Sequence, residues 1–128
     1  MSDNLREVVK LLLELGPVEL REVYEELCDR LGTRERRAES FIDIMSAIVG
    51  TDIRVRSRRH KVAWGRFIVI SELLERGWNL TMAAEVFGMD HSSVIYARDQ
   101  VDNMLVRPKM YQAEMRMYRE FKKRINNG

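Results

Sequence analysis

The chain has 128 residues, of which 45% are hydrophobic and 33% charged, and its net charge is +2. This length suits one domain, or one domain with a helical appendage. It holds no run of 18 apolar residues, which excludes a transmembrane helix, and its charged N-terminal stretch lacks the layout of a signal peptide. The single cysteine, Cys28, allows no internal disulfide and is compatible with a reducing cytoplasm. Two prolines, seven glycines and apolar residues at 3.6-residue spacing predict an all-α fold.

Charge is distributed unevenly along the sequence. Residues 1–50 carry seven Lys/Arg against eleven Asp/Glu, a balance of −4, whereas residues 51–128 carry fifteen against nine, a balance of +6. Within the second part, residues 51–66 hold six basic residues and one acidic residue. A basic segment of this kind suggests a polyanionic partner, although charge balance alone is equally compatible with a solvated surface.

Three helices are predicted in the first 50 residues. The first is capped by Asp3 or Asn4 and ends at Gly16, and the second begins at Pro17 and ends at Gly32. Thr33 then caps a third helix that closes at Gly50, with Phe41, Ile42, Ile44, Met45 and Ile48 among its core positions. The apolar positions of the first helix are Leu5, Val8, Val9 and Leu12, and those expected to face inward in the second are Val18, Leu20, Val23, Tyr24, Leu27 and Leu31.

The first two helices form an acidic helical hairpin, which we expect to be a unit of its own over residues 1–36. The second helix has a Glu-rich outer face. A solvated face that covers the core is the ordinary interpretation of such a helix. The alternative is a surface, within residues 4–32, that docks a protein partner or a second copy of the chain.

The remaining residues predict a further series of helices. Residues 54–61 form a short helical turn and a basic loop, and a long helix follows over residues 62–76. A short helix over residues 80–87 is capped by Asn79 or Thr81 and ends at Gly88. Asp90 then caps a helix that runs to about residue 105, and a last helix covers residues 108–125. The expected core positions of these helices are Phe67, Ile68, Ile70, Leu73, Leu74, Ala83, Ala84, Phe87, Val94, Ala97, Val101, Leu105, Tyr111, Met115, Tyr118 and Phe121. Residues 80–105 therefore have the layout of a helix-turn-helix.

Enzymatic chemistry is disfavoured at the polar stretch GMDHSSVIYARDQV, residues 88–101. Asp90, His91 and Ser92 are the residue types of a hydrolytic triad, but consecutive residues at a helix start point in different directions and cannot converge. Two histidines and one cysteine, at no ligand spacing, give no metal site. No phosphate-binding loop of the P-loop type is present. We therefore expect neither catalysis nor a cofactor.

DNA recognition fits the same stretch better. The second helix of a helix-turn-helix enters the major groove and presents its first residues to base edges. Those residues are short and polar, and they can donate to or accept from base edges: Asp90, His91, Ser92 and Ser93. The competing interpretation is a plain capped helix with a solvated start.

The sequence also resembles a known family. Residues 87–97, FGMDHSSVIYA, are similar to the signature FGGRDHTTVLHA of the C-terminal, origin-binding domain (domain IV) of the bacterial replication initiator DnaA. Upstream, IRVRSRRHKVAWGRFIVISELLERGWNLTMAAEVFG resembles that domain's basic loop, long helix and first helix of the helix-turn-helix. The resemblance covers roughly residues 38–126 and implies a Trp-repressor-type helix-turn-helix domain over residues 37–128.

The resemblance implies roles for particular residues. Residues 90–93 match the base-reading tetrad, and Arg58 matches, within one or two positions, an arginine that enters the minor groove. Arg66 matches a phosphate-contacting arginine, and Leu80 and Thr81 match a helix start that touches the DNA backbone. The other basic-loop residues expected near phosphates are Arg54, Arg56, Arg59, His60 and Lys61.

Departures from the family pattern narrow the expected activity. Ser92 and Ser93 replace two threonines, so methyl groups able to contact thymine are missing. Met89 replaces a basic residue in a turn that is one residue shorter, and Tyr96 stands where histidine is usual. The family's nucleotide-binding motor is not in this sequence. We therefore expect a stand-alone, cytoplasmic, nucleoid-associated protein that binds DnaA-box-like sites without ATPase activity. It would act as a replication or transcription regulator or as a mobile-element replication factor. An interaction adaptor and the DNA-binding component of a transposase-like system are the alternatives.

Overall fold

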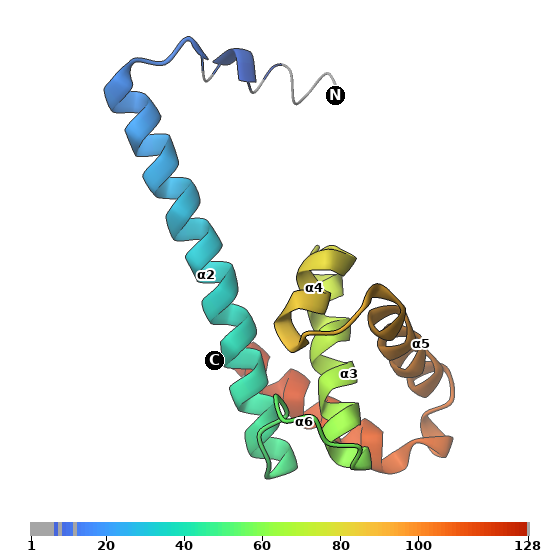
Figure 1. Ribbon diagram of the computed structural model, residues 1–128. Coiled ribbons are helices and arrows are strands. Elements are labelled where there is room, and N and C mark those ends of the chain that lie inside the picture. The colour runs from blue at the N-terminus through green and yellow to red at the C-terminus, as the bar shows by residue number, and fades with distance from the viewer. Residues whose placement is uncertain (1–6, 8, 12, 128) are drawn as a thin grey trace. The chain divides into compact units, whose positions relative to one another are not determined.

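The computed structural model describes residues 7, 9–11 and 13–127, and for residues 25, 28–31, 33–35 and 127 the backbone only. Throughout this part of the chain the regular structure is helical and there is no strand, so the predicted all-α fold is confirmed (Figure 1). The chain divides into two compact units, residues 1–36 and residues 37–128. The predicted caps Asp3 and Asn4 and the predicted apolar positions Leu5, Val8 and Leu12 lie outside the described residues.

Helix α2 (Pro17–Val49) begins where the sequence predicts, because Pro17 occupies its first position after the break at Gly16. The predicted end at Gly32 and the predicted cap at Thr33 are wrong, since the helix continues through both residues. A single glycine within a helix costs only about 1 kcal/mol relative to alanine, and strong helix formers flank Gly32 on both sides. The boundary between the two units falls within this helix.

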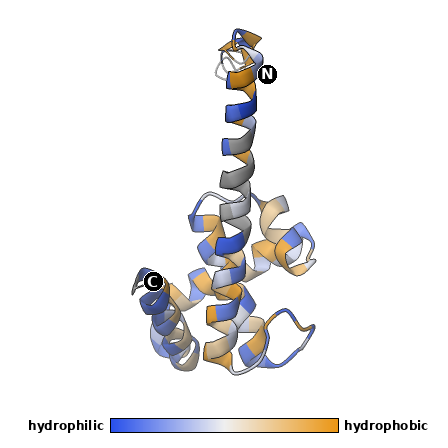
Figure 2. Cartoon of the chain, turned by 90° about the vertical axis from the view of Figure 1, so that its left-hand side faces the viewer, coloured by the Kyte–Doolittle hydropathy of each residue, from blue (hydrophilic) through white to orange (hydrophobic). Residues whose placement is uncertain are grey.

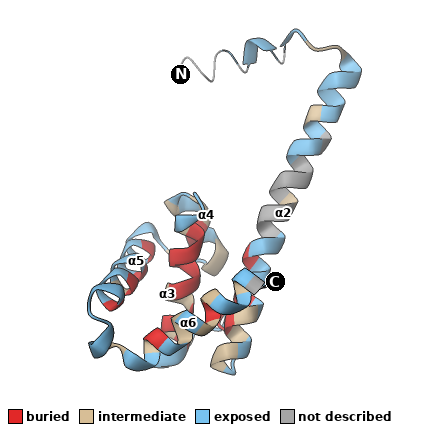
Figure 3. Cartoon of the chain, turned by 180° about the vertical axis from the view of Figure 1, so that it is seen from behind, coloured by how far each residue is buried: buried red, intermediate tan, exposed pale blue. Residues whose placement is uncertain are grey.

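The apolar side chains of α2 that belong to the first unit are largely exposed. The exposed fractions are 68% for Val18, 42% for Leu20, 69% for Tyr24 and 52% for Leu27, so their predicted inward orientation is wrong. Val23 is half-buried. Figure 3 shows this part of α2 mostly in the colour of exposed residues, and Figure 2 shows hydrophobic positions interspersed with hydrophilic ones along the helix. None of the described residues of the first unit is buried, so no core of described residues covers these side chains.

The second unit is organised around helix α3 (His60–Glu75). This helix contacts α4 (Leu80–Phe87), α5 (His91–Val106) and α6 (Gln112–Asn127), while the 3₁₀ helix η1 (Pro108–Met110) joins the last two (Figure 1). The buried side chains of the main core are Ala38, Phe41, Ile42, Met45, Ile53, Val62, Trp64, Ile68, Val69, Leu73, Val101, Met104, Met115 and Phe121. A second cluster, of Ile70, Ala83, Ala84, Val94 and Ala97, joins α3, α4 and α5. Its three alanines allow these helices to approach closely.

The C-terminal half of α2 belongs to this second unit and packs tightly. Phe41 meets Phe121 of α6 edge-on, with ring centroids 5.8 Å apart. Gly65 of α3 lies so close that a Cβ atom there would stand 3.1 Å from Met45 and Ile53 and 3.2 Å from Val49. The absence of a side chain at residue 65 therefore sets the distance between α2 and α3.

A buried carboxylate connects α3 to α6. Glu72 is 6% exposed. It accepts hydrogen bonds from Arg76, whose Nε lies 2.9 Å away, and from Lys122 of α6. Lys122 also donates to Glu75 at 3.1 Å, and the Arg76 guanidinium sits over the Phe41 ring at 4.8 Å. These contacts neutralise a charge that would otherwise be costly to bury.

Three other predictions need small corrections. Helix α3 begins at His60 rather than at residue 62, and the predicted last helix is divided into η1 and α6, which leaves Tyr111 between them. Leu105 is 41% exposed, and Met104 occupies the core position instead. Met104 lies three residues after Val101 and Leu105 lies four residues after it, and either spacing would place a residue on the same face of the helix.

No described helix combines the length and the apolar composition that crossing a membrane requires.

Candidate nucleic-acid interface

The turn between α4 and α5 is fixed by local signals at both of its ends. Asn79 caps α4 by accepting a hydrogen bond from the Met82 N–H at 2.8 Å. Gly88 ends α4 in the left-handed region, at φ 63°, which glycine adopts without steric cost. The Met89 N–H then returns to the Ala84 carbonyl at 2.9 Å. The sequence thus specifies an abrupt change of direction over residues 88–90.

Asp90 caps helix α5. Its Oδ1 atom accepts from the Ser93 N–H at 2.7 Å, with the extended backbone conformation of an N-cap. The side-chain and backbone hydrogen bonds from Ser93 hold the pKa of Asp90 below its usual value, and the neighbouring His91 acts in the same direction.

The first turn of α5 combines exposed polar side chains with a buried apolar shank. His91, Ser92 and Ser93 are exposed, whereas Val94 and Ala97 are fully buried in the second cluster. The His91 Nε2 atom lies 3.2 Å from Thr81 Oγ1, so the starts of α4 and α5 are hydrogen-bonded to each other. Leu80 packs partly buried against the second cluster. The polar tip is thus oriented outward by the packing behind it.

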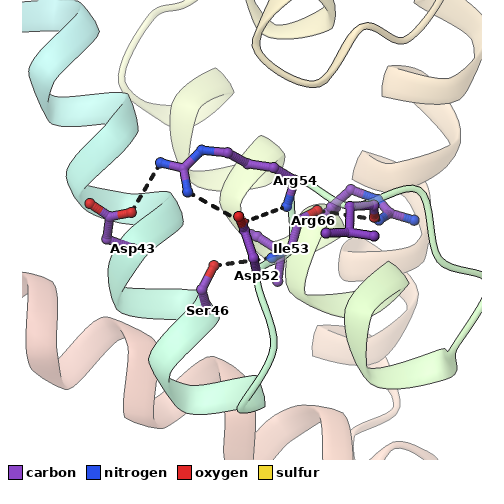
Figure 4. Close-up of polar contacts among 7 residues, drawn as sticks. Asp43, Ser46, Asp52, Ile53, Arg54 and Arg66 are labelled. Carbon is purple, nitrogen blue, oxygen red and sulfur yellow. Dashed lines mark hydrogen bonds and ion pairs between the residues drawn. The ribbon is translucent and has the colours of Figure 1, made fainter.

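The basic loop, residues 51–59, is anchored at its beginning. The Ile53 side chain is fully buried in the main core, and the Ile53 N–H donates to Ser46 Oγ at 3.1 Å. Asp52 accepts from the Arg54 N–H at 3.0 Å, which closes a tight turn (Figure 4). The first residues of this loop are therefore held against the main core of the second unit.

Arg54 bridges two carboxylates. Its guanidinium lies 3.0 Å from Asp43 of α2 and 3.3 Å from Asp52 (Figure 4). The hydrogen bond to Asp43, followed by that to Asp52, raises the pKa of Arg54. The positive charge of this residue is thus already compensated within the protein.

Arg66 of α3 binds the backbone of the basic loop. Nη1 donates to the Val55 carbonyl at 2.9 Å and to the Ile53 carbonyl at 3.3 Å, and Nη2 donates to the Ser57 carbonyl at 3.0 Å. Figure 4 shows the Arg66 side chain beside the loop next to Ile53. Partial burial lowers the pKa of Arg66. One guanidinium fork thus holds three alternate carbonyl groups of the loop.

The remaining cations of this segment are exposed: Arg56, Arg58 and Arg59 in the basic loop and Lys61 in the first turn of α3. Their side chains form no hydrogen bond or ion pair with other described residues. His60 differs, because its Nε2 atom lies 2.5 Å from Glu114 Oε1 of α6. Partial burial raises the pKa of Glu114, but the hydrogen bond and the charge of His60 outweigh that effect and leave it lowered. The predicted basic residues thus fall into a paired group and an unpaired group.

An open cleft brings the basic loop and the start of α5 together. It has a volume of about 540 Å³. Arg58 lines it from the loop, and Asp90, Ser92 and Ser93 line it from the turn and α5. The other lining residues are Ser57, Ala63, Arg66, Phe67, Met89 and Tyr96. Of the residues predicted to bind DNA, five therefore share one concave surface, whereas Arg54 is directed to the carboxylate of Asp43 on α2.

The packing roles of Trp64 and Tyr96 near the cleft were not predicted from the sequence, whereas Phe67 was predicted as a core position. Trp64 is buried at the centre of an aromatic group, 5.5 Å from the rings of both Phe67 and Tyr111. Phe67 in turn meets Tyr96 of α5 edge-on at 5.6 Å. This chain of rings fixes α5 against α3 beside the cleft. Its sequence signal is the three-residue spacing of Trp64 and Phe67, which places both on one side of a helix.

No protein-family model, curated protein or solved structure matches the chain. Within the described part of the chain, no group of three His, Cys, Asp or Glu side chains is arranged to hold a metal ion.

Proposed function

We propose that this protein binds double-stranded DNA in a sequence-specific manner through its second unit, with α4 and α5 as a helix-turn-helix. One observation carries the proposal: the unpaired Arg58 and the polar start of α5 line the same open cleft. A recognition helix needs exposed polar residues at its N-terminus and phosphate-binding cations beside it. The start of α5 and the basic loop supply both of these elements.

Affinity and specificity come from different residues in this proposal. Arg56, Arg58, Arg59 and Lys61 neutralise phosphates and supply most of the affinity, and Arg58 shares the cleft with the start of α5. His91, Ser92 and Ser93 contact base edges, and each good contact contributes about 1–3 kcal/mol of discrimination. The charges of Arg54 and Arg66 are engaged within the protein, so both residues support the loop.

The biological role that we propose follows from the similarity of residues 87–97 to the DnaA signature. The protein occupies DnaA-box-like sites in the nucleoid, without ATPase activity, as a regulator of replication or transcription or as a mobile-element replication factor.

In vitro selection of binding sites from random duplexes tests the proposal. We expect an enriched motif, with an affinity that falls as the salt concentration rises. Binding that is undetectable at low ionic strength, or insensitive to salt, would contradict it.

Two variants separate the proposed contact classes. His91→Ala should flatten sequence preference while binding to non-specific duplexes is retained, and Arg59→Ala should weaken binding to every duplex and make the salt dependence shallower. The two side chains are exposed, so neither change should disturb the core. Equal losses for both variants on every sequence would show that the roles are wrongly assigned.

Protein binding is a second candidate function. Exposed Leu20, Tyr24 and Leu27 on α2 favour it, because apolar residues gathered on one helix face often mark an interaction surface. Replacing these residues by glutamate should leave DNA affinity unchanged if the two functions use separate surfaces.

A further inference from the structure

A second group of basic side chains gathers on α6. Arg116, Arg119 and Lys123 are exposed, and they follow one another at spacings of three and four residues. At about 100° per residue, these spacings keep them on one side of the helix. We call these three residues the α6 stripe. Their side chains form no hydrogen bond or ion pair with other described residues, so no described carboxylate compensates their charges.

The other charged residues of α6 are engaged outside the stripe. Glu114 lies beside His60 of α3, and Glu120 accepts a hydrogen bond from Arg124 Nε at 2.9 Å. Lys122 donates to two carboxylates of α3. A surface that is merely solvated ordinarily carries charges of both signs interspersed. A row of three cations without a described acidic partner is therefore a feature that calls for an anionic ligand.

A cleft joins the stripe to the 3₁₀ turn that precedes α6. Its volume is about 350 Å³, and it is lined by Arg116 and Arg119 of the stripe and by Lys109 of η1. The other lining residues are Pro108, Gln112 and Met115, none of which is acidic. Lys109 is exposed and forms no hydrogen bond or ion pair with other described residues. Three cations from two elements therefore line one concave surface.

This surface is separate from the cleft at the start of α5. The two clefts share no lining residue. The first cleft lies at the beginning of α5 and η1 follows its end, and a helix of 16 residues is roughly 24 Å long (Figure 1). Glu114 marks the side of α6 that faces His60, and the stripe residues lie about 140–200° from it around the helix. The stripe therefore faces away from the side of α6 that is next to His60 and the basic loop.

We infer that the α6 stripe binds the phosphate backbone of a second DNA segment, independently of base sequence. The stripe extends over seven residues, which is roughly 10 Å along the helix axis. One strand of a duplex carries a phosphate about every 3.4 Å along its axis, so roughly three phosphates lie beside three cations. An extended polyanion matches this row better than a single small anion does. That another segment occupies the first cleft rests on the proposed function.

The number of duplexes bound per chain tests this inference. Sedimentation equilibrium of the full chain is performed at low salt, with an excess of a labelled duplex of about 12 base pairs at about 100 μM, because non-specific contacts are weak and salt-dependent. We expect the wild type to bind two duplexes. The stripe variant Arg116→Gln/Arg119→Gln should bind one, since neither residue lines the first cleft.

A matched control separates the stripe from net charge. Arg21→Gln/Arg36→Gln also removes two positive charges, from exposed positions on α2, and should bind two duplexes like the wild type. Circular dichroism on the same samples checks that each variant keeps its helical content. Inorganic pyrophosphate, at the same concentration as the duplex, should leave the second duplex bound, because it can occupy only part of the stripe.

The possible results distinguish this inference from the proposed function. One duplex on both the wild type and the stripe variant would overturn the inference and leave the first cleft as the binding surface. One duplex on the wild type and none on the stripe variant would support the stripe and contradict the proposed function. No duplex on the wild type would overturn both. Loss of the second duplex in the α2 control, or its displacement by pyrophosphate, would also overturn the inference.

Discussion

Arg66 offers a direct test of how the basic loop is built. Its guanidinium donates to the carbonyls of Ile53, Val55 and Ser57. Replacement by alanine leaves these acceptors without their donor. The Val55 carbonyl is at the surface and can bind water, whereas the other two bonds are partly buried. At about 1–1.5 kcal/mol for each of the two, Arg66→Ala should lower the free energy of unfolding by about 2–3 kcal/mol.

The loss of the fork should also weaken DNA binding, for an indirect reason. The unpaired cations follow or surround the carbonyls that Arg66 holds, so a released loop must be ordered again when phosphates are bound. Fixing the backbone of one residue costs about 1–2 kcal/mol. Two such residues together cost about 2–4 kcal/mol and would reduce affinity by roughly 30-fold to 900-fold. Arg66→Lys should rescue little, because an ammonium group cannot reproduce three hydrogen bonds from a planar fork.

Urea denaturation without DNA and binding titrations at several salt concentrations distinguish this role from a direct phosphate contact. If Arg66 instead contacted a phosphate directly, both the unfolding free energy and the salt dependence of binding would change differently in Arg66→Ala. Arg66→Ala would then leave stability within about 0.5 kcal/mol of the wild type, make the salt slope shallower by about 0.9, and be rescued by lysine. That combination would refute a supporting role for Arg66.

Four further substitutions test the fold around the candidate interface. Gly65→Ala should lower the free energy of unfolding by about 1–3 kcal/mol in urea denaturation, because its Cβ would stand 3.1 Å from Met45 and Ile53. At Gly32 an added Cβ would have no atom within 4 Å. Gly32→Ala should therefore stabilise the α2 helix, and circular dichroism would detect this. Lys122→Met should cost about 1–2 kcal/mol, since it leaves the buried Glu72 with Arg76 alone, and an unchanged denaturation midpoint would contradict this. Asp90→Ala should lower the melting temperature at neutral pH. The pKa of Asp90 is lowered in the folded protein. The stabilisation by the Asp90 carboxylate is therefore present above its ordinary pKa of 3.8 and is lost as the pH falls through the lower, folded pKa. In acid, the melting temperatures of the wild type and of Asp90→Ala should converge.

The sequence predicts the elements of the candidate interface well where the signals are local. Asn79, Gly88 and Asp90 each act on backbone groups within five residues, and the bounds of α4 and the start of α5 agree with prediction. A sequence signal for the end of a helix is less decisive when the residues around it favour the helix. Gly32 was expected to end a helix, but a glycine ends one only if the following residues leave helical geometry, and those of α2 do not.

Contacts between distant segments were beyond sequence reasoning. A basic residue at the start of a helix gives no indication that its guanidinium will meet the carbonyls of Val55 and Ser57, because the path of the preceding loop decides this. The partners of Arg54 depend in the same way on Asp43, eleven residues earlier on another element. The exposure of Tyr24 and Leu27 was also unpredictable, since periodicity identifies an apolar face without saying what covers it.

The division between paired and unpaired cations leads to a quantitative expectation for DNA binding. If each of the six basic residues in 51–66 contacted a phosphate, the logarithm of the binding constant would fall against the logarithm of salt concentration with a slope of about −5.4. Arg54 and Arg66 are engaged by carboxylates and carbonyls, and releasing either would forfeit hydrogen bonds that hold the loop. Only Arg56, Arg58, Arg59 and Lys61 then release counterions, which gives a slope of about −3.6. Titrations of the wild type and of Arg54→Gln over the same salt range measure this. An unchanged slope in Arg54→Gln would support the conclusion that Arg54 does not contact a phosphate. A slope shallower by about 0.9 would show that it does.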